Sequence, residues 1–236
     1  MRQPVSSRTP EPPSDCDLCA RLVTFRDANR TLAADWHNAP VPSFGPSDAR
    51  LLIVGLAPGL KGANRTGRPF TGDFAGDLLY QTLLEFGFAT GAYRASPDDG
   101  IVLHDCMITN AVRCVPPQNK PTPAEIAQCR TFLAPRMDSL PRLRTILALG
   151  RIAHDSTLKA LGLRLAAFPF AHGARHAVQP DVALFDSYHC SRYNTNTGVL
   201  TPTMFKSVFA AIRSDLGRAD SAETRSQPGL IRDSSA

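Results

Sequence analysis

Four short apolar runs dominate the hydrophobic pattern of the chain, at residues 51–56, 107–112, 145–149 and 182–188. Each run gives way within a few residues to Gly, Pro, Asn or Ser. Continuous apolar runs of this length, bounded by turn residues, are typical of strands that are buried on both faces. The pattern therefore predicts four core strands of one sheet.

Apolar residues recur at helical spacing between and after these runs, at residues 74–86, 123–137, 152–161 and 202–216. Two of these stretches begin with a capping Thr followed by Pro, at Thr122 and Thr201, which is a typical helix start. Alternating strands and helices favour right-handed crossovers and a parallel sheet covered on both faces. The predicted fold class is α/β, a three-layer α/β/α architecture with a central four-stranded parallel sheet.

Each predicted strand is followed by a loop of unusual composition. The four loops contain GLAPG, NAVRCVPPQNKP, GRIAH and HCSRYNTNTG, in chain order. Because the carboxyl ends of parallel strands meet at one edge of a sheet, these loops are expected to form the rim of a site there.

Composition places these elements in one domain. The chain has 236 residues, of which 43% are apolar, which suits one compact core over residues 15–216. Residues 1–14 and 217–236 are polar and aperiodic, and we expect both tails to be disordered. The sequence has no apolar run of about 18 residues and no apolar signal segment, so we expect a cytoplasmic protein.

The charge pattern changes the picture modestly. The net charge is +5, which favours polyanionic partners without proving one. Many of the basic residues lie in or beside the strand-end loops: Lys61, Arg65, Arg68, Arg113, Lys120, Arg151 and Arg192. Scattered, solvated charge is the alternative explanation.

The six cysteines are expected to be reduced in the cytosol, so they point to metal ligation or simple burial. Cys16 and Cys19 form a CxxC pair, Cys114 follows the second strand, and Cys129 lies on the next helix. Four thiolates suffice for tetrahedral zinc or for a [4Fe–4S] cluster, and their spacing does not separate the two. Alternatively, Cys114 and Cys129 are ordinary buried residues. The remaining pair, Cys106 and Cys190, is expected to pack in the core, with Cys106 a spare ligand.

Two residues at the predicted rim are candidates for chemistry. Asp73 ends the glycine-rich loop 55–73, which contains neither a P-loop nor a dinucleotide-binding fingerprint. An N-terminal helix cap is the simpler explanation for Asp73. His189 opens a loop rich in hydroxyls and amides at the end of the fourth strand. A lone His is often structural, but this position favours a functional role.

The motifs GLAPGLKGANRTGRPFTGD, NAVRCVPPQNKPTPAEIAQC, ALGRIAH and SYHCSRYNTNTG, in this order, resemble the family 5 uracil-DNA glycosylases. That branch carries an iron–sulfur cluster, and the resemblance spans about residues 12–216. It implies the fold of uracil-DNA glycosylases and a pocket for a flipped-out deaminated base. It also resolves the choice of metal in favour of [4Fe–4S], with a structural role for the cluster.

The resemblance implies roles position by position. The cluster ligands correspond to Cys16, Cys19, Cys114 and Cys129. The base-binding positions correspond to Gly55, Ala57, Phe70 and Asn110, with the ring of Phe70 stacking on the base and the amide of Asn110 contacting its polar edge. The catalytic positions correspond to Asp73, His189 and Asn119. The expected DNA contacts are Arg65, Arg68, Lys120, Ser191, Arg192 and Tyr193.

Two departures bear on these roles. Other glycosylase families place Asp or Asn in the first motif near Ala57 or Gly59, where this chain has neither; family 5 lacks it too, so the water-handling role falls to Asp73. Tyr193 stands where the last motif usually has Gln, which concerns how the loop enters DNA.

The expected function is therefore a DNA repair glycosylase, a hydrolase that removes uracil and other deaminated bases such as hypoxanthine. Its expected partner is double- or single-stranded DNA at the nucleoid, and the expected state is a monomer. Two alternatives remain open: a uracil-specific family 4 type enzyme, and a non-catalytic nucleic-acid-binding module with a structural metal site.

Overall fold

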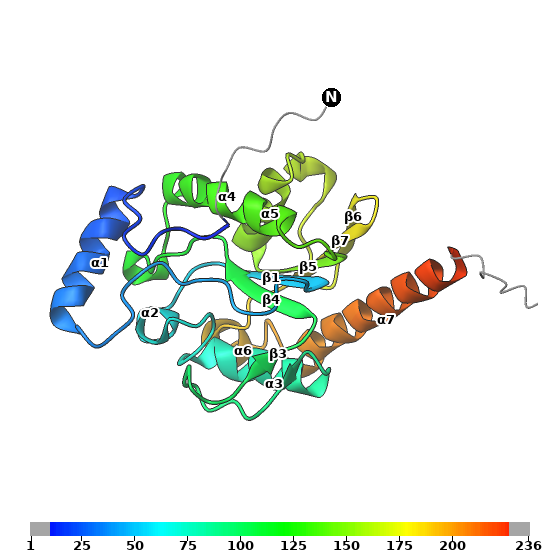
Figure 1. The fold of residues 1–236 in the computed structure, drawn as a ribbon, viewed down its shortest axis with the longest axis horizontal. Helices are drawn as coiled ribbons and strands as arrows, with labels where there is room; N and C mark the ends of the chain where they lie inside the picture. Colours follow the sequence, from blue (N-terminus) through cyan, green and yellow to red (C-terminus); the bar gives the residue numbers. More distant parts are fainter. Residues whose placement is uncertain (1–9, 227–236) are drawn as a thin grey trace, which may run out of the picture.

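The computed structural model describes residues 10–226 (Figure 1). The strands are β1 (Leu51–Gly55), β2 (Ala89–Thr90), β3 (Val102–Leu103), β4 (Cys106–Asn110), β5 (Thr145–Leu149), β6 (Arg175–Gln179) and β7 (Val182–Ser187). The helices are α1 (Ala20–Leu32), α2 (Ala63–Thr66), α3 (Phe74–Glu85), α4 (Pro123–Asp138), α5 (Arg151–Ala160), α6 (Arg192–Asn196) and α7 (Pro202–Ser226), with 3-10 turns η1 (Pro117–Asn119) and η2 (Leu165–Ala167).

The central sheet has five strands in the order β4-β1-β5-β7-β6. The first four are the predicted core strands, and they pair in parallel as expected. The fifth strand, β6, pairs antiparallel with β7 at one edge, so the expected four-stranded, purely parallel sheet is wrong in count and in one direction. The sequence pattern missed β6 because only one of its five residues, Val178, is buried, which leaves no apolar run to detect.

Helices cover both faces of this sheet, with α4 and α5 on one face and α3 and α7 on the other (Figure 1). Alternate residues of β1 supply the two cores: Leu51 and Ile53 pack with α3 and α7, whereas Leu52 and Val54 pack with α4 and α5. This alternation follows from the period of two along a strand. The predicted α/β/α layering is confirmed.

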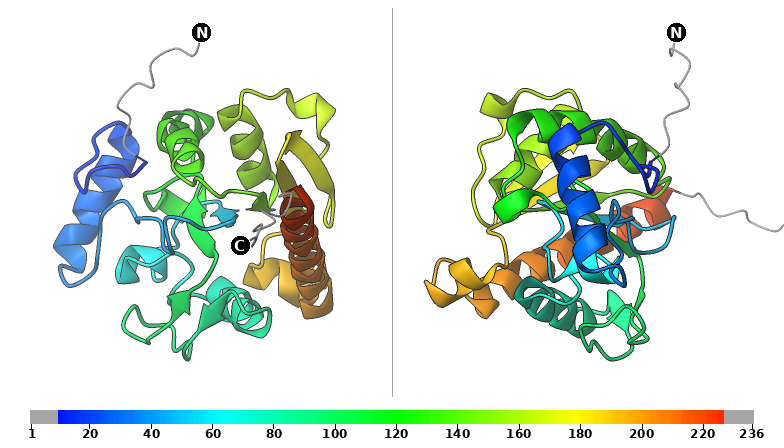
Figure 2. Two further views of the ribbon diagram at one scale, coloured as in Figure 1. Left: turned by 45° about the vertical axis from the view of Figure 1, so that its right-hand side comes forward. Right: turned by 90° about the vertical axis from the view of Figure 1, so that its left-hand side faces the viewer.

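The ends of the chain differ from the expected tails. Helix α7 runs to Ser226 and projects past the body of the molecule (Figures 1 and 2). Residues 217–226 are therefore helical rather than disordered. At the other end, Glu11 pairs with Arg113 and Arg136, so residues 10–14 belong to the fold. Residues 1–9 and 227–236 of the two predicted tails lie outside the described residues.

Helix α1 was not predicted from the sequence, because it has only a weak apolar pattern. It lies beside the start of α4 (Figures 1 and 2), where Arg21 donates two hydrogen bonds of 2.7 Å to Glu125. Leu22 on its inner side packs against Val112 and Cys129. Within residues 10–226, no helix combines the length and apolar character needed to cross a membrane.

Candidate active site and metal centre

A pocket opens at the carboxyl edge of the sheet, where the strand-end loops meet. Its lining residues come from three regions far apart in the sequence: Ala57, Pro58, Gly59, Ala63, Phe70, Asp73, Ala75, Asn110 and His189. Five of these were candidate site residues from the sequence. Four others, Pro58, Gly59, Ala63 and Ala75, were not, because small residues in a loop carry no chemical signal of their own.

The glycine-rich loop makes room for the carboxylate of Asp73. Oδ2 of Asp73 faces Gly59 and Gly62, and a Cβ atom at either position would crowd it, at 3.0 Å for residue 59 and closer for residue 62. The loop thus folds directly over the carboxylate because two of its residues have no side chain.

Asp73 is also the N-cap of α3, as the sequence indicated. Its Oδ1 accepts a hydrogen bond of 3.2 Å from the backbone N–H of Gly76. Burial raises the pKa of Asp73 above 3.8, and the N–H groups of Gly76 and Ala75 only partly offset this. One carboxylate oxygen therefore caps the helix while the other faces the pocket, so the capping and functional explanations are compatible.

Phe70 and Asn110 meet above Gly55. A Cβ atom on Gly55 would overlap both the ring of Phe70 and Oδ1 of Asn110, so glycine at this position allows their approach. Oδ1 of Asn110 is buried and has no hydrogen-bond partner among the described residues. A buried acceptor without a partner is costly unless a ligand satisfies it.

The backbone of Phe70 is held in an uncommon conformation. Its φ is +53°, which is unfavourable for a bulky residue. Two tyrosine hydroxyls fix this turn: Tyr80 donates to the carbonyl of Pro69 (2.8 Å) and Tyr93 to that of Phe70 (3.2 Å). The ring of Phe70 is thereby preset in the pocket, and no sequence motif pointed to these two tyrosines.

His189 forms the opposite wall. Its ring stacks on that of Phe70 with centroids 5.9 Å apart and planes inclined by 28°. Burial lowers the pKa of His189 to about 4, so the imidazole is neutral at physiological pH. A neutral imidazole can still donate one hydrogen bond.

Several predicted DNA-contact residues lie at the surface. Arg65, Lys120, Arg192 and Tyr193 are exposed and Ser191 is partly buried. Ser191 caps α6, and the guanidinium of Arg192 lies 5.2 Å from the ring centroid of Phe74, the residue after Asp73. Tyr193 is 74% exposed. Arg192 therefore lies close to the pocket, and its neighbour Tyr193 is exposed on the same short helix.

The expectation that Arg68 contacts DNA is wrong. Its side chain is buried and makes a two-pronged ion pair with Asp99, with both N–O distances 2.8 Å. The hydrogen bonds from Arg68 lower the pKa of Asp99. The rings of Tyr80 and Tyr93 also lie within 6 Å of the Arg68 guanidinium. The buried guanidinium thus lies against the two tyrosines that hold the turn at Phe70.

Two other sequence candidates do not reach the pocket or the rim. Asn119 is exposed on η1 and does not line the pocket, so the structure offers no catalytic contact for it. Arg113 is buried and donates to Val41, Ser43, Thr109 and Glu11. It ties the N-terminal segment to the sheet rather than facing solvent.

Four cysteines share a second cavity, between the segment before α1, the loop after β4 and helix α4. Cys16 and Cys19 come from the segment before α1, Cys114 follows β4, and Cys129 lies on α4. Leu22 and Phe132 complete its apolar wall. The backbone N–H of Arg113 donates to Sγ of Cys129 (3.2 Å). We call this the thiol cavity.

The chemistry of the thiol cavity fits a metal group held by thiolates, because four cysteines from three segments line one apolar space. A separate group of His154, His176 and Asp186, whose ligand atoms lie within 4.8 Å of one another, belongs to another part of the fold. Burial raises the pKa of Cys114 to about 11 and that of Cys129 to about 12.

The other two cysteines lie apart from this cavity. Cys106 donates to the carbonyl of Phe88 and Cys190 to that of Ala75, and both are fully buried. All six cysteines are free thiols. The predicted packing role of Cys106 and Cys190 agrees with these contacts.

Comparison with known proteins decides the family. The model of the uracil DNA glycosylase superfamily matches residues 42–213. A type-5 uracil-DNA glycosylase of Thermus thermophilus is 46% identical over 198 residues, which cover 82% of this chain and 90% of that protein. The chain belongs to the type-5 uracil-DNA glycosylases. A second member, from Pyrobaculum aerophilum, is 37% identical over 86% of this chain and 90% of its own length.

Membership confirms the resemblance and the enzyme class, a uracil-DNA glycosylase that hydrolyses N-glycosyl bonds. The type-4 relatives match less of the chain: that of P. aerophilum is 34% identical over 52% of this chain and 56% of its own length. Because the matching proteins are glycosylases, the alternative of a non-catalytic nucleic-acid-binding module is not supported.

Proposed function

We propose that this enzyme removes uracil and hypoxanthine from DNA by hydrolysis of the N-glycosidic bond, with Asp73 and His189 as its catalytic residues. One observation carries the proposal: the pocket places a carboxylate, an unpartnered amide oxygen and an aromatic ring around one space. The expected substrate is DNA, from which the target base leaves the stack to enter this space.

Base selection rests on Asn110. Its buried Oδ1 can accept from N3–H of uracil or from N1–H of hypoxanthine. Both bases present this N–H beside a carbonyl oxygen, whereas cytosine has an unprotonated N3 and an amino group. Rejection of a base that leaves Oδ1 unpaired costs about 1–3 kcal/mol. The ring of Phe70 stacks on the extruded base whatever its identity.

Bond cleavage develops positive charge on the sugar and negative charge on the leaving base. Oδ2 of Asp73, under the glycine loop, orients the attacking water and stabilises the cationic sugar, while Oδ1 remains on the helix cap. The neutral ring of His189 donates to the oxygen of the departing base. Fixed groups of opposite character on the two sides are what such a transition state requires.

The thiol cavity is proposed to hold a [4Fe–4S] cluster through Cys16, Cys19, Cys114 and Cys129. In such a cluster each thiolate binds a different iron, and the cavity offers four cysteines, one for each. When bound, the cluster supplies structural cross-links between α1, the β4 loop and α4. No step of base removal passes through it.

DNA is proposed to lie across the carboxyl edge of the sheet. Arg65, Lys120 and Arg192 hold phosphates, which positions the duplex without selecting sequence. Exposed Tyr193, next to Arg192 on α6, is proposed to occupy the gap left by the extruded base. Ser191 caps the start of α6 and so helps to orient Arg192 and Tyr193 on that helix.

The experiment is incubation of the purified enzyme with end-labelled DNA containing U·G, U·A or hypoxanthine·T pairs, followed by alkali. Strand cleavage at each damaged base is expected, with none at cytosine. An enzyme with intact metal content that leaves all three substrates uncut would overturn the proposal. Cleavage at uracil but not at hypoxanthine would restrict the proposed substrates to uracil.

A further inference from the structure

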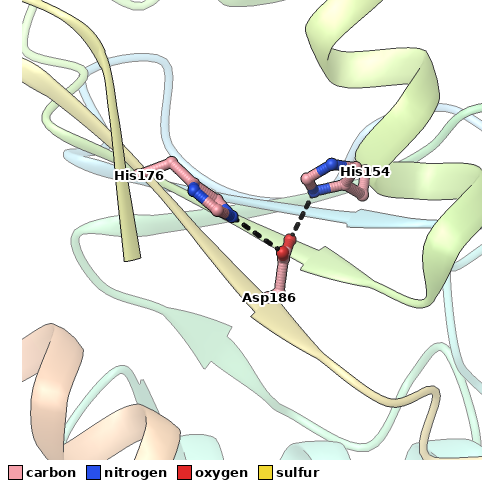
Figure 3. Close-up of side chains that lie close together, drawn as sticks. All are labelled: His154, His176 and Asp186. Carbon is pink, nitrogen blue, oxygen red and sulfur yellow. Dashed lines mark hydrogen bonds and ion pairs between the residues drawn. The ribbon is translucent and has the colours of Figure 1, made fainter. Parts of the chain in front are cut away.

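Three side chains form a buried polar cluster that the proposed reaction does not use (Figure 3). Asp186 on β7 lies between His154 on α5 and His176 on β6. Nδ1 of His154 is 2.7 Å from Oδ1 of Asp186, and Nε2 of His176 is 3.2 Å from Oδ2. His154 ends the GRIAH motif, which the active site leaves unexplained.

The hydrogen-bond partners fix the number of protons in this cluster. Nε2 of His154 lies 2.9 Å from the carbonyl oxygen of Phe168, which can only accept, so Nε2 carries a proton. The short contact between Nδ1 and Asp186 then needs a second, shared proton, on either the imidazole or the carboxyl group. While this proton is in place, Nδ1 has no free lone pair for a metal ion. The trio is therefore a hydrogen-bonded cluster.

The surroundings favour retention of that proton. Burial opposes charge on His154, but the hydrogen bond and the charge of Asp186 outweigh it and raise the pKa of His154. The Phe168 carbonyl and Asp155 on α5 act in the same direction. Loss of the proton would leave a nitrogen lone pair facing a buried carboxylate, which is repulsive.

The cluster is connected to His189 through β7, which carries Asp186 and ends two residues before His189. The backbone N–H of Gly150, which precedes α5, donates to the carbonyl of Ser187 (2.8 Å). A Cβ atom on Gly150 would lie 3.5 Å from Cβ of His189. The first turn of α5 is thus joined to β7 at Ser187 and again, through His154, at Asp186. The residue before His189 is also held from the loop that precedes β6: Nδ1 of His172 in that loop accepts a hydrogen bond from the N–H of Tyr188 (3.2 Å).

We propose that the proton shared by His154 and Asp186, with support from His176, locks α5 onto β7 and so positions His189 in the pocket. His154 and Asp186 are then positioning residues, and the proposal rests on the proposed role of His189. Deprotonation at alkaline pH releases the lock, and the His189 ring loses its fixed place opposite Phe70.

Histidine NMR of the 15N-labelled wild-type protein with its native metal tests the proton without reference to activity. We expect one downfield, slowly exchanging proton from the Nδ1–Oδ1 hydrogen bond at about pH 7, lost in Asp186→Asn. Absence of that proton in the folded wild-type protein would overturn the proposal, even if uracil excision is normal.

Single-turnover excision across alkaline pH tests the positioning. We expect the wild-type rate to fall as pH rises through the raised pKa of His154. In His154→Gln the rate at neutral pH should be on the order of 10-fold lower, without that alkaline limb and with unchanged affinity for abasic DNA. His104→Gln is the matched control, because His104 is exposed and contacts only the Thr90 hydroxyl among the described side chains.

His176→Gln removes the longer hydrogen bond to Asp186, which comes from β6 at the sheet edge. This variant provides the same test if His154→Gln does not fold. We expect a smaller rate loss and an alkaline limb moved to higher pH, because the Asp186 carboxylate holds the shared proton more tightly once it has lost the His176 hydrogen bond. Wild-type rates and pH profiles in the folded variants would refute the lock. Lack of excision by the wild-type enzyme would instead refute the proposed function and leave the NMR result standing.

Discussion

Gly62 lies against the carboxylate of Asp73 so closely that a Cβ atom at position 62 would overlap Oδ2. The glycine is therefore required by a neighbour eleven residues further along the chain, as well as by its own loop. Gly62→Ala is expected to displace the carboxylate and to lower the single-turnover rate by on the order of 10²-fold, a typical cost of a misplaced reacting group. Gly217→Ala, at a glycine on α7 with open space around its Cβ position and no left-handed φ, shows the effect of an alanine elsewhere; equal rates in both variants would contradict the argument.

Asp73→Asn separates the capping role from the catalytic one. Asn caps helices nearly as well as Asp, so the change in unfolding free energy should be about 1 kcal/mol or less. Because burial raises the Asp73 pKa, the ionised carboxylate costs stability at neutral pH, and its loss should not lower the Tm. The single-turnover rate should fall by about 10²-fold or more. Asp77→Asn, at an exposed acid in the first turn of α3, is the control. A rate within threefold of wild type in Asp73→Asn would show that Asp73 is not the catalytic carboxylate.

The acid side of the pH–rate profile should report Asp73. The raised pKa means that Asp73 becomes protonated, and excision slows, at a pH above the ordinary 3.8. His189 stays neutral over most of this range because its pKa is lowered to about 4. Single-turnover rates between about pH 4 and 7, with folding checked by circular dichroism, give the midpoint. A flat profile down to pH 4 would exclude Asp73 as the required anion.

Arg68 and Arg192 should respond in opposite ways to removal of charge. Arg68→Ala leaves Asp99 buried without its partner, which typically costs about 3–5 kcal/mol of unfolding free energy, measured by urea denaturation. Arg192→Ala should leave stability unchanged and reduce the slope of log K for DNA against log[salt] by about 1. Arg218→Ala, on α7 beside the amino edge of the sheet, should change neither; an unchanged salt slope in Arg192→Ala would remove it from the DNA surface.

The thiol cavity predicts the metal content. Anaerobically purified enzyme should contain about four irons per chain and absorb broadly near about 400 nm. Cys114→Ala should lose the iron and much of the folded protein, whereas Cys106→Ala, outside the cavity, should keep its iron. Stoichiometric zinc without iron, or full iron in Cys114→Ala, would refute the cluster assignment.

Sequence reasoning found the site residues that have a reactive group and also lie in a recognisable motif. It failed for residues whose role depends on an interaction partner far away in the sequence. Asp73 and His189 stand at recognisable strand and helix ends, so their approach was predictable from topology. Arg68 was assigned to DNA because a basic residue in a glycine-rich loop looks the same whether its partner is phosphate or Asp99. The pairing depends on the fold of residues 91–100, which has no periodic pattern. Tyr80 and Tyr93 were missed for the same reason.

Asn110 and Cys114 are the two ends of one short stretch of backbone. Between them, Ala111 and Val112 donate hydrogen bonds of 2.9 Å to the carbonyls of Gly55 and Leu56, and Arg113 donates to Cys129. The amide that we propose to select the base and the cysteine that we propose to bind the metal therefore share one backbone support. We expect a protein that matures without its metal to be disturbed in base selection as well as in the N-terminal segment.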